Sequence, residues 1–203
     1  MRIEIAGALS CGKSTLAGKL EALGLKIVRE DLSTNPYLDL RVEDPEQYDF
    51  PCQRQFVLDK IASIRDADAA GVPYVCDFSL AAERAYVTHY ADGRSSWIDP
   101  LFGLLDDCEA AVGPADLVVY LRCAPEEQLN RIRIRGREFE QGHDVAFVSK
   151  INALVDLHVR SQQAAYGVEI AEYWTDRMDW CDIVADITSR HLQRLGFLPG
   201  IAA

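Results

Sequence analysis

The feature that most constrains this fold is an eight-residue stretch near the N-terminus, residues 7–14, with the sequence GALSCGKS. It fits the phosphate-binding pattern G-x-x-x-x-G-K-[ST], and it lies between residues 2–6, predicted as a strand, and residues 13–23, predicted as a helix. Its glycines let the backbone curl, so that successive N–H groups face phosphate oxygens at the start of a helix. The stretch therefore predicts a nucleotide-binding loop, the P-loop.

This loop predicts roles toward ATP and Mg²⁺. Lys13 should reach the β- and γ-phosphates, and the Ser14 hydroxyl should be a ligand of Mg²⁺. The residues expected to bind ATP form one continuous run: Gly7, Ala8, Leu9, Ser10, Cys11, Gly12, Lys13, Ser14 and Thr15.

Short apolar runs alternate with helical patterns along the rest of the chain. Further strands are predicted at 25–28, 72–76, 116–121 and 169–174, and helices at 45–70, 125–135, 145–163 and 183–195. The sequence DPEQ at 44–47 should open the first of these helices, and Pro51 should kink it or delay its start. Continuous apolar strands between helices are typical of a parallel sheet covered on both faces. We therefore predict an α/β fold, a P-loop NTPase three-layer sandwich with a five-stranded parallel sheet, in which residues 1–203 form a single domain.

In such sheets the ligand lies beyond the carboxyl ends of the strands. That rule makes Gly7, Glu30, Asp77 and the segment after Leu121 neighbours in space, although they are far apart in sequence.

Composition narrows the partners. The formal net charge is −11, which disfavours binding to a nucleic acid polymer. No stretch approaches the roughly 18 apolar residues of a membrane helix. The first apolar run passes directly into the P-loop rather than into a cleavage site, so we expect a cytoplasmic protein without a secretory signal.

Four arginines fall within seven positions: Arg131, Arg133, Arg135 and Arg137. Neighbouring guanidinium groups repel one another unless an anion lies between them, and their planar forks suit phosphate oxygens. The segment therefore favours an arginine-rich lid over residues 131–142. A solvated helix end with Glu138 and Glu140 as counter-charges stays open as the alternative.

With these motifs in place, the chain resembles the deoxynucleoside kinase family. Five segments match in order and together span about residues 3–160. They are the P-loop, Glu30 followed by NPYL at 35–38, DPE at 44–46 leading to Gln53, VCDFS at 75–79, and 116–121 leading to the arginine segment.

The resemblance implies a role for each matched residue. Glu30 corresponds to the general base for the 5′-hydroxyl, with Asp31 as its adjacent rival, and Asp77 corresponds to a carboxylate near Mg²⁺. Lys13, Arg131 and Arg135 would contact phosphates and complete the catalytic group. The residues expected to bind substrate are Gln53, which would read the nucleobase edge, Lys60 on the same helical face, Tyr37 and Tyr86 for base stacking, and Arg137 and Glu140 beside the sugar.

Two positions depart from the family pattern. Phe78 stands where the family often has an arginine, so it cannot supply a guanidinium to the phosphates or to Glu30. One of the four lid arginines, for example Arg133, is a candidate to replace it. Val42 stands where a tyrosine touches the sugar, which leaves the choice between deoxyribose and ribose open.

The leading interpretation is an ATP-dependent kinase that phosphorylates the 5′-hydroxyl of a small (deoxy)nucleoside. The alternatives are a nucleoside monophosphate kinase and a non-catalytic relative that acts as a structural or regulatory subunit. A GTPase is improbable because the Asn-Lys-x-Asp motif is absent. The family also suggests a homodimer, for which a helical face near Phe56, Ile61 and Ile64 could serve.

Overall fold

The computed structural model describes residues 1–140 and 142–197, and of Glu138 it describes only the backbone. Within this part the sheet has five parallel strands in the order β2-β3-β1-β4-β5. Their bounds are β1 (Arg2–Ala6), β2 (Lys26–Val28), β3 (Tyr74–Cys76), β4 (Leu117–Arg122) and β5 (Glu169–Trp174). Every residue of β1 is buried, because the central strand is covered on both faces, and its two charged residues, Arg2 and Glu4, form an ion pair with each other at 2.9 Å. The predicted five-stranded parallel sheet is confirmed.

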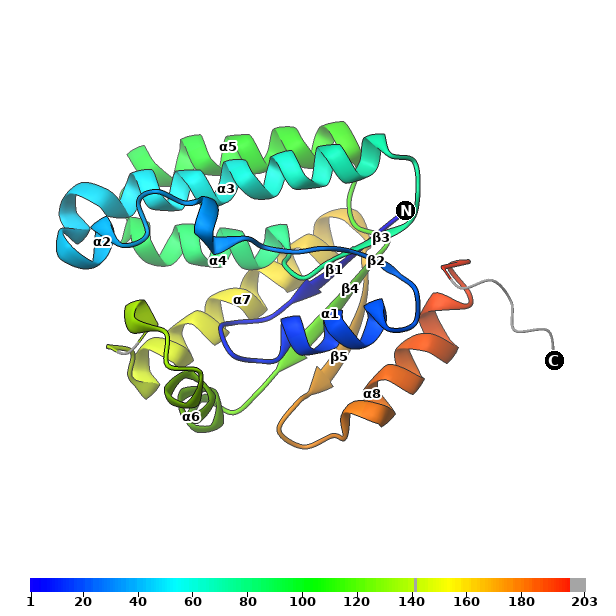
Figure 1. Cartoon of the computed structure of the whole chain (residues 1–203). Helices are drawn as coiled ribbons and strands as arrows, with labels where there is room; N and C mark the ends of the chain where they lie inside the picture. The colour runs from blue at the N-terminus through cyan, green and yellow to red at the C-terminus, as the bar shows by residue number, and fades with distance from the viewer. Residues whose placement is uncertain (141, 198–203) are drawn as a thin grey trace.

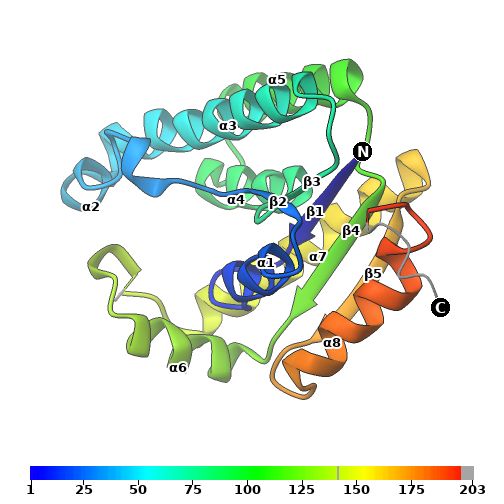
Figure 2. The same cartoon turned by 45° about the vertical axis from the view of Figure 1, so that its right-hand side comes forward.

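Helices cover both faces of the sheet (Figure 1). On one face, α1 (Lys13–Glu21), α8 (Trp180–Asp186) and a π-helical turn (Ile187–Leu192) pack against one set of strand side chains. On the other face, α4 (Leu80–Ala91) and α7 (Val145–Tyr166) pack against the alternate set. The three-layer arrangement is also visible after rotation (Figure 2).

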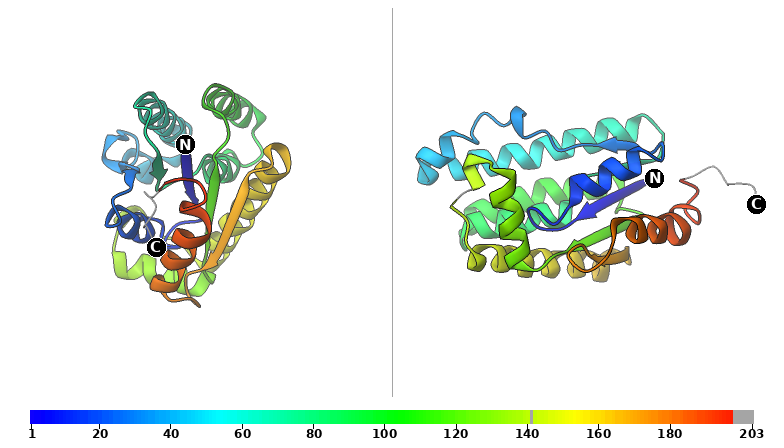
Figure 3. Two further views of the ribbon diagram at one scale, coloured as in Figure 1. Left: turned by 90° about the vertical axis from the view of Figure 1, so that its right-hand side faces the viewer. Right: turned by 60° about the horizontal axis from the view of Figure 1, so that its bottom comes forward.

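A further pair of helices, α3 (Pro45–Ala69) and α5 (Ser95–Val112), packs on α4 and on β3. Both views in Figure 3 show this pair along one side of the sheet. Ile61 and Ile64 of α3 are buried within its core. Of the two interpretations that the sequence left open for this face, a dimer contact or a buried core face, the structure supports the core face at Ile61 and Ile64.

Several helix ends differ from the predicted ones. Helix α3 begins at the predicted Pro45, where the Asp44 carboxylate accepts a hydrogen bond from the Gln47 N–H at 3.1 Å. Pro51 lies inside this helix, so of its two expected effects the delayed start does not occur. Helix α1 ends at Glu21, two residues before the predicted end at 23, and Leu23 is exposed. Helix α8 begins three residues before the predicted 183, because Asp179 caps it by accepting the Cys181 N–H.

The segments that border the site are short. They are a 3₁₀ turn (Leu32–Thr34), α2 (Leu40–Glu43), α6 (Pro125–Arg135) and a second 3₁₀ turn (Glu138–Glu140). The predicted lid over residues 131–142 includes position 141, which lies outside the described residues, as do 198–203 of the predicted domain. None of the helices in the described part of the chain combines the length and apolar character needed to cross a bilayer.

Candidate active site

A cavity of about 610 Å³ opens beyond the carboxyl ends of β1, β2 and β3. Such a volume suits small ligands, and the place agrees with the rule for parallel sheets. Its lining includes most of the predicted site residues: Gly7, Leu9, Ser10, Gly12, Lys13, Ser14, Thr15, Glu30, Gln53, Lys60, Asp77, Tyr86, Arg131, Arg135, Arg137 and Glu140.

Three predicted residues lie outside this lining. Ala8 and Cys11 are buried behind the loop, so only their backbone is available to a phosphate. Tyr37 stacks on Tyr48 with ring centroids 6.5 Å apart, which places its ring away from the cavity that it was predicted to line.

The P-loop is packed tightly against the sheet. A Cβ atom at Gly7 would lie 2.6 Å from the backbone oxygen of Leu121 in β4, so only glycine fits there. Lys13 folds back over the loop and donates hydrogen bonds to the carbonyl oxygens of Gly7 (2.9 Å) and Ala8 (3.0 Å). The ammonium group is therefore held inside the curl where phosphates are expected.

Helix α6 is anchored to the P-loop through Thr175, a residue that the motifs did not indicate. The Thr175 hydroxyl donates to the carbonyl of Cys11 at 2.9 Å, and Arg131 donates to both the hydroxyl and the carbonyl of Thr175 at 3.0 Å. Gln128 adds a hydrogen bond to the carbonyl of Leu9 at 2.7 Å. The base of the predicted lid is thus fixed beside the phosphate site.

The outer arginines of this segment meet Glu140, which is buried. Arg135 forms an ion pair with the Glu140 carboxylate, and Arg137 lies 3.5 Å from its other oxygen. Glu140 therefore acts as the counter-charge that the alternative interpretation expected, while both arginines still line the cavity. Arg133 is exposed and is not among the described residues that line the cavity.

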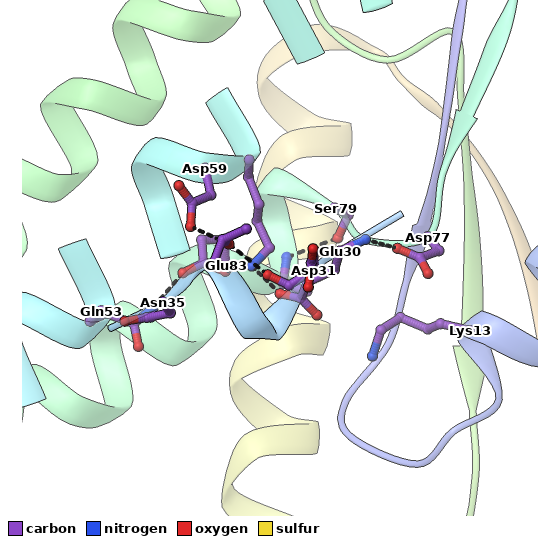
Figure 4. Close-up of polar contacts among 12 residues, drawn as sticks. Lys13, Glu30, Asp31, Asn35, Gln53, Asp59, Asp77, Ser79 and Glu83 are labelled. Atoms are coloured by element: carbon purple, nitrogen blue, oxygen red, sulfur yellow. Dashed lines mark hydrogen bonds and ion pairs between the residues drawn. The ribbon is translucent and has the colours of Figure 1, made fainter. Parts of the chain in front are cut away.

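A chain of polar contacts crosses the middle of the cavity (Figure 4). Gln53 donates to one oxygen of Glu83, and Lys60 approaches the other oxygen at 2.8 Å. The same ammonium group forms an ion pair with Glu30, whose backbone N–H donates to the Asp77 carboxylate at 2.7 Å. Glu83 lies on α4, six residues after Asp77, and could not be predicted as a site residue from any motif.

Burial and charge act in opposite directions on these groups. Burial alone would raise the pKa of Glu30, but the cations of Lys60, Lys13 and Arg137 hold that pKa below its usual range. Burial raises the pKa of Glu83, with Lys60 opposing it. Burial would lower the pKa of Lys60, yet Glu30 and Glu83 together raise it. Glu30 is thus ionised and able to accept a proton.

Lys60 supplies the cation in direct contact with Glu30. Arg133 does not line the cavity and so does not replace the arginine missing at Phe78, whereas the charge of another lid arginine, Arg137, also lowers the pKa of Glu30. Phe78 is buried with the α3 and α5 side chains, and its ring centroid lies 5.7 Å from the Lys60 ammonium. Val42 lines the cavity although it is 58% exposed, and next to it the Arg41 guanidinium lies 4.1 Å from the ring centroid of Tyr90.

The residues present fit a magnesium ion bound through ATP. Ser14 and Asp77 both line the cavity, and one Asp77 oxygen accepts the Glu30 N–H, which leaves the second oxygen available. No group of three His, Cys, Asp or Glu ligands occurs in the described ranges. Mg²⁺ commonly takes only one or two protein ligands and completes its shell with phosphate oxygens and water.

Comparisons with known proteins agree with this geometry. A sequence model described as deoxynucleoside kinase matches residues 3–176. Over 146 residues the chain is 33% identical to the deoxyadenosine/deoxycytidine kinase of Bacillus subtilis (strain 168), covering 68% of this chain and 67% of that protein. Over 148 residues it is 31% identical to a deoxyguanosine kinase of Lactobacillus acidophilus, covering 68% and 64%. The matches therefore span about two thirds of these relatives.

The fold is shared with a solved structure. Deoxyadenosine kinase from M. mycoides with bound dCTP superimposes with a TM-score of 0.77 at 19% identity, over 98% of this chain and 100% of that one. These relatives do not favour a monophosphate kinase or a non-catalytic subunit. The chain belongs to the deoxynucleoside kinase family and is a phosphotransferase that acts on deoxynucleosides.

Proposed function

We propose that this chain transfers the γ-phosphoryl group of ATP to the 5′-hydroxyl of a deoxynucleoside, with Glu30 as the general base. The observation that carries this proposal is the position of Glu30. Its ionised carboxylate lines the cavity between the P-loop, where the donor phosphates bind, and the Gln53–Glu83 pair. A carboxylate placed there accepts the hydroxyl proton as the oxygen attacks phosphorus.

The phosphate contacts come from the loop and the lid. Lys13 is already held over the curl of the loop, and Arg131 and Arg135 face the same cavity from α6. Their charges stabilise the phosphoryl oxygens in the transition state, where negative charge spreads. Ser14 and Asp77 would hold Mg²⁺, which neutralises phosphate charge when it is bound.

The acceptor end of the cavity has the chemistry to select a nucleobase. Gln53 offers an amide, and the Glu83 carboxylate accepts hydrogen bonds only, so bases with an exocyclic amino group fit this pair better than thymine. The name of the B. subtilis relative, deoxyadenosine/deoxycytidine kinase, agrees with that preference. Tyr86, Arg137 and Glu140 line the same cavity. In this proposal Tyr86 offers a surface for the base, and Arg137 and Glu140 border the sugar.

A coupled ADP-release assay across deoxyribonucleosides, ribonucleosides and monophosphates tests this function. We expect turnover with deoxyadenosine and deoxycytidine, and none above background in the Lys13→Ala variant. Glu30→Gln should lower kcat by roughly 10²–10⁴-fold and change the KM for ATP little. Turnover confined to monophosphates would refute the proposed acceptor, and full activity of Glu30→Gln would refute the assigned base.

A further inference from the structure

We propose that Lys60 is a positioning residue that holds the base Glu30 in place and links it to the nucleobase-reading carboxylate Glu83. It takes over the task of the guanidinium that this chain lacks at Phe78. The inference rests on the proposed function, because it concerns how the two ends of the acceptor site are connected.

The Lys60 ammonium group is fixed from several sides. Its side chain is 7% exposed, and it contacts one oxygen of Glu30 and one oxygen of Glu83. The ring centroids of Phe56 and Phe78 lie 5.1 Å and 5.7 Å from its nitrogen. An ammonium group with three donors can satisfy both carboxylates at once, whereas the surrounding rings offer it no competing acceptor.

The other cations near Glu30 also contact groups other than Glu30. Lys13 donates hydrogen bonds to loop carbonyls, and Arg137 lies near Glu140. Lys60, by contrast, stands on α3, a helix whose inner face is buried in the core with α5. The charged groups that face Glu30 from the packed elements are Lys60 on α3, Lys13 at the start of α1, Arg137 in the lid, Asp77 after β3 and Glu83 on α4.

Loss of Lys60 would leave Glu30 and Glu83 without the cation that lies between them. The two carboxylates would repel each other, and Glu30 would turn away from the position that the 5′-hydroxyl proton requires. A displacement of about 1 Å at a reacting group lowers a rate by roughly 10²-fold. The KM for ATP should stay unchanged, because the donor phosphates bind on the opposite side of Glu30.

A double-mutant cycle with Glu30 tests this link. We expect Lys60→Gln to lower kcat by roughly 10–100-fold, while Lys60→Arg, the matched control that keeps the charge, retains at least about a third of it. In the Glu30→Gln background, Lys60→Gln should lower kcat by less than about twofold, since no base remains to be positioned.

Folding is checked by the melting temperature of each variant with and without ATP. If Lys60→Gln fails to fold, all four members of the cycle carry Glu83→Gln, which removes one cation and one anion together and makes the lost nucleobase contact common to every variant. An equal loss of kcat in both backgrounds would overturn the proposal, and so would an equal loss in Lys60→Arg and Lys60→Gln. A kinase in which Glu30→Gln is inactive but Lys60→Gln is unimpaired would refute this inference and leave the proposed function intact.

Discussion

Alanine introduced at Gly12, at the end of the P-loop, would meet two obstacles that the same residue would not meet at Gly18. Gly12 has φ 102°, a conformation that side-chain-bearing residues rarely adopt, and a Cβ there would lie 2.6 Å and 2.7 Å from two ring carbons of Trp180. Gly18 lies inside α1, where an added Cβ meets nothing within 4 Å. The same substitution should therefore change stability in opposite directions six residues apart.

The magnitudes can be assigned separately. The left-handed backbone costs a residue with a side chain about 1–2 kcal/mol, and displacing a packed ring costs about 1–3 kcal/mol. Gly12→Ala should thus destabilise the chain by about 2–5 kcal/mol in total. Gly24→Ala carries only the first cost, because φ is 90° and nothing lies within 4 Å of the added atom. Gly18→Ala should stabilise the chain by about 0.5–1 kcal/mol, since alanine loses less backbone entropy than glycine in a helix.

Urea unfolding of the three variants measures these values. From highest to lowest, the urea midpoints should follow the order Gly18→Ala, wild type, Gly24→Ala, Gly12→Ala. The slope of the free energy of unfolding against urea concentration should be the same in all four proteins. In a Trp180→Ala background, the cost of Gly12→Ala should fall to that of Gly24→Ala. If Gly12→Ala is no worse than Gly24→Ala in the wild-type background, the indole yields at little cost, and the argument from rigid packing against the loop is wrong.

Three further perturbations have expected outcomes. Arg84→Met should destabilise the chain by about 3–5 kcal/mol, since it leaves the buried Glu109 carboxylate without its cation. Adding Glu109→Leu to the Arg84→Met variant should recover much of the lost melting temperature. Burial and Arg84 lower the pKa of His158, so the unfolded chain takes up that proton first. The free energy of unfolding should therefore decline as the pH falls below about 6.5, and His158→Gln should flatten that decline in urea titrations. Pro51→Ala should raise the urea midpoint by an amount worth about 1–3 kcal/mol, because it restores a hydrogen-bond donor inside α3; an unchanged midpoint would contradict this reasoning.

The parts of the fold that could be predicted are those with a local signal. A buried parallel strand needs apolar residues on both faces, so β4 stands out as an apolar run from Leu117 to Leu121, and β1 was placed by its position directly before the P-loop. The P-loop could be recognised because its glycines stand where a side chain would clash, as at Gly7, which lies close to the backbone of β4. Helix α4 gave no such signal, because it is packed between other helices and the sheet and is buried on several sides.

The site could be predicted only as far as its motifs reached. Glu30, Gln53 and Lys13 carry recognisable spacing, and all three line the cavity. Glu83 and Thr175 carry none, because each acts through a contact with a distant segment: Glu83 with α3, and Thr175 with the P-loop. A lid arginine was expected to replace the missing cation, and Arg137 does lower the pKa of Glu30, but packing brings Lys60 into direct contact with it.

Lys60 and the arginines of the predicted lid stand on different parts of the fold. Arg135 and Arg137 stand on or after the last turn of α6, where they pair with Glu140. The partner of Glu30 instead stands on α3, which is fixed in the core with α5. The direct ion pair of Glu30 is therefore made with a core helix and not with the predicted lid. Phe78 packs in the core with side chains of α3 and α5, so this position brings no charge to the site, and the cation that contacts Glu30 comes from a buried position of α3.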